Sequence, residues 1–430
     1  MVAGVLDGVR VVELASYVAA PTAGRLLAAF GAEVIKIERP GVGDELRRWH
    51  TFGSETSLLW RSLGRNKKSV TVDLRQPEGR DLVLHLVARS DVVVEGFRPG
   101  TLERLGLGPD VLAGVRPDLI LVRISGFGQT GPYRDQAGFG SVAEAMGGVR
   151  FLTGYPDRPP TRAGVSLGDS VAGLYAAFGA VLGLLERRSA ATEPAGAGAS
   201  PGAVGTSGTP SAASSLAGAE PAEVVDVALY EAVYSLLDSV VAEYDTFGVV
   251  RQRTGPSIAG VVPSSTYRCA DGKYVVIAAN ADAVFERFVR AIGRPEMAGD
   301  PRYQGPEARG KAEEEIDGIV AAWVAERDLA EVVAAMTGAG VPATPIYDAA
   351  DIAADPHFAA RGTHDRHDIP LGDRVAAGVP FPAPVPRLSR RPAQARWAGP
   401  DLGEHTREVL GGLLGVPDDR LDDLAARKVI

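Results

Sequence analysis

The sequence predicts an α/β fold in which strands and helices alternate around a largely parallel sheet. Its first apolar run, VRVVEL at 9–14, is short and rich in β-branched residues, which is typical of a strand buried on both faces. A helical pattern and a second such run at 34–37 follow, and further short runs occur at 70–74, 92–95 and 119–124. Because strands that alternate with helices build doubly wound layers, we expect one parallel sheet in this part of the chain.

Local patterns predict the elements between and after these strands. Pro21 suits the first turn of a helix that Gly31 ends, and a second helix spans 77–89. Further along the chain, Asp271-Gly272 between two short strands is typical of a tight hairpin. Apolar residues at helical spacing then predict helices at 283–292, 313–326, 329–336 and 405–414. The hairpin and the first three of these helices predict a smaller α+β module.

Composition and charge exclude several classes of protein. A chain of 430 residues is about three times a typical domain of ~150, so two or three domains are expected. The 54 acidic side chains outnumber the 45 basic ones, and the net charge of −9 opposes binding to nucleic acids. A single cysteine, Cys269, allows no internal disulfide and suits the reducing cytoplasm. We expect no membrane partner, because no apolar run approaches the ~18 residues that span a bilayer and the N-terminus lacks a signal-peptide pattern.

One segment, 189–222, differs in composition from the rest of the chain. Of its 34 residues, 30 are Ala, Gly, Ser, Thr or Pro. So few large apolar side chains cannot offset the conformational entropy that ordering would remove. The composition therefore predicts a disordered linker.

Two motifs that suggest ligand sites do not fit their surroundings. GFGQTG at 126–131 matches the G-x-G-x-x-G pattern after a strand, but Pro132 and Tyr133 follow it and no acidic residue stands about 20 positions on, so we interpret it as a Gly-rich turn and not an NAD site. His364 and His367 in a loop lack the partners that a zinc site needs, so no metal site is expected.

A helix over 170–188 begins next to a carboxylate, Asp169. On spacing alone Asp169 is an N-cap, because caps greatly outnumber catalytic carboxylates. A helix N-terminus also favours the ionised form that a nucleophile requires, so the two roles are compatible. The helix is predicted from an apolar stripe formed by Val171, Leu174, Tyr175, Phe178, Val181, Leu182 and Leu185.

Longer strings resemble a known family over nearly the whole chain, except 189–222, which we interpret as an insertion. The strings VIKIERPGVGD, ISGFGQTGPYRDQAGF, GVSLGDSVAG and VPATPIYDAADIAADPHFAARG resemble the family III CoA-transferases. That family includes formyl-CoA transferase, carnitine CoA-transferase and α-methylacyl-CoA racemase.

The resemblance implies a fold and a domain layout. It implies a Rossmann-like large domain built from both ends of the chain, a smaller α+β domain between them, and a homodimer of two subunits interlinked like rings. We therefore expect the N-terminal, CoA-binding part of the large domain at 1–188, the linker at 189–222, the small domain at 223–338 and the return to the large domain at 339–430.

The resemblance also implies a reaction. Asp169 would attack an acyl-CoA thioester, and CoA would pass through an aspartyl anhydride and an aspartyl-CoA thioester to a free carboxylic acid. CoA is then a substrate, and no permanently bound cofactor is implied. The positions that match the family's CoA contacts are Ala19, Arg39, Leu74, Arg75, Phe97 and Arg104.

Three pocket positions depart from the patterns of particular family members. Phe139 stands where the racemases have a histidine that moves the α-proton, and phenylalanine transfers no proton. Val18 replaces a glutamine of formyl-CoA transferase, and Gly260 lies where that enzyme has a run of glycines. The stretch around Gly260 is most similar to the succinyl-CoA-dependent members that use citramalate or glutarate. A racemase or isomerase and a non-catalytic CoA-binding protein remain as alternatives.

Overall fold

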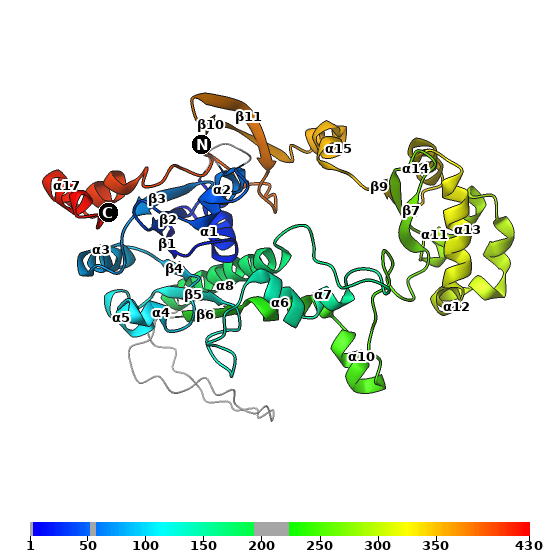
Figure 1. Cartoon of the computed structure of the whole chain (residues 1–430), viewed down its shortest axis with the longest axis horizontal. Coiled ribbons are helices and arrows are strands. Elements are labelled where there is room, and N and C mark those ends of the chain that lie inside the picture. Colours follow the sequence, from blue (N-terminus) through cyan, green and yellow to red (C-terminus); the bar gives the residue numbers. More distant parts are fainter. Residues whose placement is uncertain (1–2, 52–56, 193–222) are drawn as a thin grey trace. The chain divides into compact units, whose positions relative to one another are not determined.

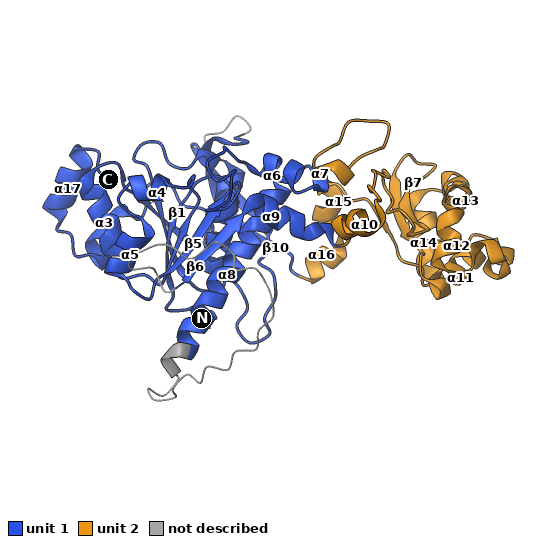
Figure 2. Ribbon diagram, turned by 90° about the horizontal axis from the view of Figure 1, so that it is seen from below, with its two compact units in different colours: residues 1–149, 163–238, 362–430 blue, residues 150–162, 239–361 orange. Residues whose placement is uncertain are grey.

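The structure is a computed structural model that describes residues 3–51, 57–192 and 223–430, and it forms two compact units (Figures 1 and 2). Both units contain segments that are far apart in the sequence. Unit 1 comprises 1–149, 163–238 and 362–430, and unit 2 comprises 150–162 and 239–361.

A six-stranded parallel sheet lies at the centre of unit 1 (Figure 1). The strands lie in the order β3-β2-β1-β4-β5-β6 and all pair in parallel, which confirms the predicted α/β fold. From β1 the chain adds strands first on one side of the sheet and then, from β4, on the other side, so the point where the order reverses lies between β1 and β4. The six strands are β1 (Arg10–Leu14), β2 (Glu33–Glu38), β3 (Lys67–Thr71), β4 (Val92–Glu95), β5 (Ile120–Ser125) and β6 (Glu223–Ala228).

Helices cover both faces of this sheet, because successive side chains of each strand point to opposite faces. Val11 packs with α1 (Ala19–Ala29), α8 (Leu167–Thr192) and α9 (Leu229–Tyr234), whereas Val12 packs with α3 (Pro77–Val87), α5 (Pro109–Val115) and the C-terminal α17 (Asp418–Ala426). The other helices described in unit 1 are α2 (Leu58–Leu63), α4 (Thr101–Arg104), α6 (Gly140–Met146), the 3-10 helices Glu45–Arg48 and Ser235–Leu237 and the π-helix Glu408–Leu413. The strands β10 (His364–Leu371) and β11 (Arg374–Pro382) form a hairpin.

The long helix α8 turns a narrow face of small residues to the fold. A Cβ added to Gly173 would lie 2.6 Å from the carbonyl oxygen of Ala19, and one added to Gly179 would lie 2.5 Å from the Val225 side chain. The helix can therefore approach α1 and the sheet closely, with Ala172, Ala176, Ala180 and Leu184 buried. Most of its larger apolar residues are exposed instead: Leu174, Tyr175, Phe178, Val181, Leu182 and Leu185.

Part of α8, Leu167–Ser189, is long and apolar enough to cross a membrane by length and composition. This differs from the expectation that no apolar segment reaches about 18 residues. A helix of a protein core can be equally long and apolar. Because α8 packs on α1, β5 and β6, we interpret it as such a core helix.

Unit 2 is an α+β module. A three-stranded antiparallel sheet of β7 (Ser264–Arg268), β8 (Tyr274–Ala278) and β9 (Ala343–Pro345) contains the hairpin expected at Asp271-Gly272. Helices α11 (Asp282–Ala291), α13 (Glu313–Ala325) and α14 (Leu329–Gly338) share its core. The shorter helices are α7 (Val149–Leu152), α10 (Val240–Phe247), α12 (Gly305–Lys311), α15 (Ala349–Ala354), α16 (Pro356–Ala360) and the 3-10 helices Pro295–Gly299 and Pro301–Tyr303.

The boundaries of the two units differ from the predicted ones. Residues 223–238 belong to unit 1 and not to the small domain, because β6 pairs with β5. Residues 339–361 belong to unit 2, because β9 pairs with β8, and the chain returns to unit 1 at 362. The predicted linker begins within α8, and 193–222 lie outside the described residues.

Candidate active site

Two adjoining pockets lie at the carboxyl ends of the strands of unit 1. Ser16 follows β1 and Phe97 follows β4, and both residues line both pockets. Between β1 and β4 the strand order reverses, which is where open parallel sheets bind their ligands. We call them the Asp169 pocket and the Arg75 pocket, after the charged residue of interest in each.

The Asp169 pocket is small, with a volume of about 90 Å³. Pockets for drug-sized ligands measure roughly 300–1,000 Å³, so this one suits only a small group. Asp169 is half-buried in the first turn of α8, which begins at Leu167 and not after Asp169 as a capping role would require. The positive end of the helix dipole there favours a charged carboxylate.

Gly140 brings a backbone segment directly against the carboxylate of Asp169. A Cβ added to Gly140 would lie 2.2 Å from Oδ2 of Asp169, so no side chain fits there without moving it. Gly126 and Gly138 also approach each other closely, because a Cβ on Gly126 would lie 2.7 Å from the Cα of Gly138. The segment GFGQTG bends the chain and forms neither helix nor strand, and Gly128 in it has a positive φ of 86°.

The Arg75 pocket contains two of the expected arginines. Its volume is about 200 Å³, and Arg39, Leu74, Arg75 and Phe97 line it, all of them expected CoA contacts. Asp73 holds the guanidinium of Arg75 through two hydrogen bonds, from Nε at 2.8 Å and from Nη2 at 2.6 Å. These hydrogen bonds lower the pKa of Asp73 to about 2. Two arginines give the pocket donors of the kind that bind phosphate groups.

The remaining expected residues have different positions. Ala19 and Phe139 line the Asp169 pocket. Val18, next in the chain to Ala19, is buried instead among Leu46, Trp60 and Leu63. Arg104 lines neither pocket, and its Nη2 donates a hydrogen bond to the hydroxyl of Thr101 at 2.8 Å. Gly260 belongs to unit 2, where its φ is 77°.

The structure adds pocket residues that sequence reasoning missed, including Ser16, Tyr17, Arg98 and Gln136. Tyr17 and Arg98 are neighbours in sequence of the expected residues Val18 and Phe97, and this adjacency is the one signal that the sequence contains. Gly140 follows Phe139 in the same way. Their roles depend on contacts between loops, which no local pattern specifies.

Two buried carboxylates, Glu95 and Asp44, hold the loops that follow β4 and β1, and these loops line both pockets. The backbone N–H of Phe97 donates to Oε2 of Glu95 at 2.7 Å, and Arg123 pairs with the other oxygen at 2.8 Å. Burial raises the pKa of Glu95, although Arg123 opposes the shift. The backbone N–H of Tyr17 donates in the same way to Oδ1 of Asp44 at 3.1 Å.

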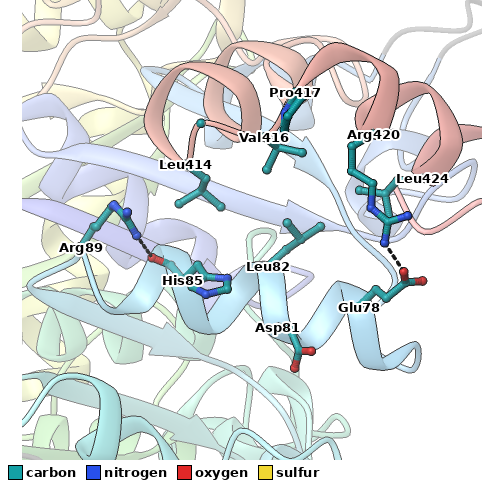
Figure 3. A pocket seen from close by; sticks show the side chains of 11 residues that line it. Glu78, Asp81, Leu82, His85, Arg89, Leu414, Val416, Pro417, Arg420 and Leu424 are labelled. Atoms are coloured by element: carbon teal, nitrogen blue, oxygen red, sulfur yellow. Dashed lines mark hydrogen bonds and ion pairs between the residues drawn. The ribbon is translucent and has the colours of Figure 1, made fainter.

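A larger cavity of about 430 Å³ lies elsewhere in unit 1, between α3 and the C-terminal segment (Figure 3). Leu82 and Leu424 contribute apolar surface, and Glu78 forms an ion pair with Arg420. None of the expected site residues lines it, so we place the candidate site at the strand ends.

Among the described residues, no group of three or more His, Cys, Asp or Glu could hold a metal, and His364 and His367 lie on β10 and not in a loop.

Comparison with known proteins assigns the chain to a family. The model of CoA-transferase family III matches residues 6–200 and 192–406, so the chain belongs to this family and is a CoA-transferase. It is 46% identical over 428 residues to succinyl-CoA–D-citramalate CoA-transferase of Chloroflexus aurantiacus, covering 99% of this chain and 98% of that protein. It is 31% identical to succinyl-CoA:glutarate CoA-transferase of Mus musculus, covering 99% and 90%.

Solved structures agree with the fold. A CaiB/BaiF family protein from Brucella suis superimposes with a TM-score of 0.78 at 31% identity, covering 96% of this chain and 100% of that one. A hypothetical protein from Mycobacterium tuberculosis superimposes with a TM-score of 0.74 at 28% identity, covering 94% and 99%.

Proposed function

We propose that this enzyme moves CoA from an acyl-CoA thioester to a free carboxylic acid, with Asp169 as the covalent nucleophile. The observation that carries the proposal is the carboxylate of Asp169 in a small pocket that adjoins a second pocket with two arginines. A thioester that extends through both pockets has its acyl end at Asp169 and its phosphates at Arg39 and Arg75. CoA is a substrate in this scheme, and the enzyme needs no bound cofactor.

The first half of the reaction transfers CoA to the enzyme. A carboxylate oxygen of Asp169 attacks the thioester carbonyl, the C–S bond breaks, and a mixed anhydride and the CoA thiolate form. The thiolate then attacks the aspartyl carbon of the anhydride. This step releases the donor acid and leaves an aspartyl-CoA thioester.

The second half repeats these steps in reverse. The carboxylate of the acceptor acid attacks the aspartyl-CoA thioester, and the thiolate leaves and then attacks the acceptor carbon of the new anhydride. The products are the acceptor's CoA thioester and a free Asp169 carboxylate. The reaction consumes no water, and water would hydrolyse the anhydride and thioester intermediates. The close approach of Gly140 to Asp169 and the small pocket volume support the proposal, because both leave little room for water.

The expected CoA contacts take separate roles. Arg39 and Arg75 are proposed to bind the phosphates, because they line one pocket. Leu74 and Phe97, in that pocket, are proposed to contact the adenine and pantetheine. Ala19 lies in the Asp169 pocket, and Arg104 on α4 is proposed as an outer phosphate contact.

We propose succinyl-CoA as donor and a short dicarboxylic acid as acceptor. Relatives of this chain are named for succinyl-CoA with D-citramalate, L-malate or glutarate, and all three acids are dicarboxylates of four or five main-chain carbons. The small Asp169 pocket supports an acid of this size. Phe139 in its lining offers no group for moving an α-proton, which favours CoA transfer over racemisation.

We further propose that the enzyme is an interlinked homodimer in the cytoplasm. The exposed apolar face of α8 supports the dimer, because monomeric proteins rarely leave a contiguous apolar surface of this kind uncovered. The single cysteine, Cys269, is buried and free, which agrees with a reducing compartment.

The test is a panel of free carboxylic acids with succinyl-CoA as donor, followed by mass spectrometry of the products. New CoA thioesters should form from four- and five-carbon dicarboxylates, together with an equal amount of succinate. Incubation with succinyl-CoA and hydroxylamine should convert Asp169 to its hydroxamate. If CoA is transferred but the hydroxamate is found on another residue, the assignment of Asp169 is refuted. If CoA is transferred to none of the acids, the proposed function is refuted.

A further inference from the structure

Tyr17 has an unusual backbone conformation at the edge of the Asp169 pocket. Its φ is 70°, in the left-handed region that a bulky residue rarely adopts. The loop between β1 and α1 that contains Tyr17 also supplies Ser16 to the pocket, and Ala19, the first residue of α1, lines it as well. A strained residue in such a place indicates that its neighbours fix it there.

A buried ion-pair network provides that support. Oδ1 of Asp44 accepts the backbone N–H of Tyr17 at 3.1 Å, and Oδ2 of Asp44 lies 2.8 Å from Nζ of Lys36. Lys36 is fully buried, and it also pairs with Glu13 at 2.8 Å and donates to the carbonyl oxygen of Ala15 at 2.6 Å. Because Asp44 is held on its other oxygen by Lys36, it fixes the backbone of the loop at Tyr17.

The ring of Tyr17 lies between two other aromatic rings. Its centroid is 5.8 Å from that of Trp49 and 5.4 Å from that of Phe139, and the contact with Phe139 is edge to face at 84°. Tyr17 and Phe139 line the same pocket as Asp169. The two rings therefore form an apolar wall that limits the space beside the carboxylate.

We propose that Tyr17 is a specificity-determining residue that limits the length of the acid that can reach Asp169. This inference rests on the proposed function. A ring that is packed against Trp49 and Phe139 on a fixed backbone excludes longer chains better than a flexible side chain does, because it cannot move aside without losing these ring contacts. The hydroxyl is not needed for this role, whereas the ring is.

The test compares Tyr17→Ala with Tyr17→Phe. For each protein, kcat/KM is measured with succinyl-CoA and the linear dicarboxylic acids of five, six and seven carbons. One methylene in an apolar pocket changes kcat/KM by about 10–200-fold. Tyr17→Ala should therefore raise the ratio of kcat/KM for the seven-carbon acid to kcat/KM for the five-carbon acid by about 10-fold or more. Tyr17→Phe should keep the wild-type ratio. Tyr133→Ala removes another exposed aromatic ring of unit 1, one that is absent from the pocket lining, and should also keep it.

Each outcome decides one of the two proposals. If wild type transfers CoA to no acid, the proposed function fails. If wild type transfers CoA and Tyr17→Ala keeps the wild-type ratio, the role of Tyr17 is refuted while the function stands. Should Tyr17→Ala fail to fold, as judged by circular dichroism, Phe139→Ala removes the other ring of the wall and must shift the ratio in the same direction. An unchanged ratio in Phe139→Ala would then overturn the inference.

Discussion

At the scale of single residues, Asp169 lies in the first turn of a helix, which is a common place for an aspartate, and it also lines a pocket. Asp169→Ala should lower the rate of CoA transfer by about 10³-fold or more, because Asp169 is the one carboxylate among the described residues that line this pocket. The transfer rate is measured by mass spectrometry of the product thioesters. CoA binding, measured by calorimetry, should persist, since the Arg75 pocket is unchanged.

A matched control separates chemistry from helix stability. Asp110 also lies in the first turn of a helix, α5, but it lines neither pocket. Asp110→Ala should lose only the favourable interaction with the helix N-terminus, about 0.3–1 kcal/mol of stability, and keep its transfer rate. Near-normal transfer by a folded Asp169→Ala protein would show that another group is the nucleophile.

Gly140 gives a second prediction at this scale. Gly140→Ala places a Cβ 2.2 Å from Oδ2 of Asp169, so the carboxylate must move, and a displacement of about 1 Å can cost about 10²-fold in rate. We therefore expect kcat to fall by about 10-fold or more, with the protein still folded, in steady-state kinetics. Gly114→Ala in α5 meets no atom within 4 Å, so it should leave kcat unchanged. Equal kcat values for the two variants would contradict the assigned contact.

Sequence reasoning proposed the residues that short motifs define and did not name those whose place in the pockets depends on the fold. Asp169 and Arg39 stand in strings that resemble the family, and Arg75 matches one of the family's CoA contacts, so the sequence alone was enough to propose them. Tyr17 and Gly140 have no such signal, because their roles come from contacts with Phe139 and Asp169 across loops. Val18 shows the opposite case: it is next to the pocket in sequence, but its side chain packs inward.

At the scale of elements, α8 shows what periodicity can and cannot predict. The stripe from Val171 to Leu185 correctly predicted a helix. It did not predict which face would be buried, because glycines and alanines on another face allow closer packing on the sheet than the large residues would. Periodicity locates an amphipathic helix, but close-packing with the neighbouring elements decides its orientation.

The exposed stripe of α8 leads to a prediction about assembly. Leu182 is 48% exposed in one chain, and in the proposed homodimer it is covered. Leu182→Asp places an uncompensated charge on this face and should weaken dimerisation by about 100-fold or more. Analytical ultracentrifugation over a range of concentrations measures the change.

A surface control tests whether any new charge has the same effect. Val375→Asp also replaces an exposed apolar residue, 63% exposed on the β10–β11 hairpin, and should leave the dimer intact. If Leu182→Asp remains as dimeric as wild type and Val375→Asp, α8 is not part of the interface.

At the scale of the whole molecule, long-range strand pairing set the limits of prediction. Local patterns predicted the first five strands of the parallel sheet, although the third spans Lys67–Thr71 and not 70–74. They predicted no strand at β6, and the predicted boundaries put this segment in the small domain. Its partner, β5, ends almost 100 residues earlier, at Ser125, and nothing near Glu223–Ala228 identifies that partner. The return of the chain to unit 1 at 362 rather than 339 has the same cause, because β9 pairs with β8.

The buried charges of unit 1 make the stability of the whole fold depend on pH. Burial alone would raise the pKa of Glu38, but two hydrogen bonds from Arg47, at 2.8 and 2.7 Å, lower it below its usual value. The pKa of Asp44 is lowered likewise, against its burial, mainly by Lys36. Both carboxyls thus bind a proton less tightly when folded than when unfolded. Their stabilisation is complete above the unfolded pKa of about 4 and is lost as pH falls through the folded values.

We therefore expect the midpoint of urea unfolding to be constant near neutral pH and to fall steadily as pH drops below about 5. Glu38→Gln removes one partner of a buried pair, so it should cost about 3–5 kcal/mol at pH 7 and make the acid decline shallower, because one of the responsible groups is gone. Glu307→Gln removes a fully exposed partner of Lys311 and should change neither the midpoint nor its pH dependence appreciably. Urea titrations followed by circular dichroism between pH 3 and 8 measure both quantities. A decline of the same steepness in Glu38→Gln and wild type would show that acid sensitivity arises outside this network.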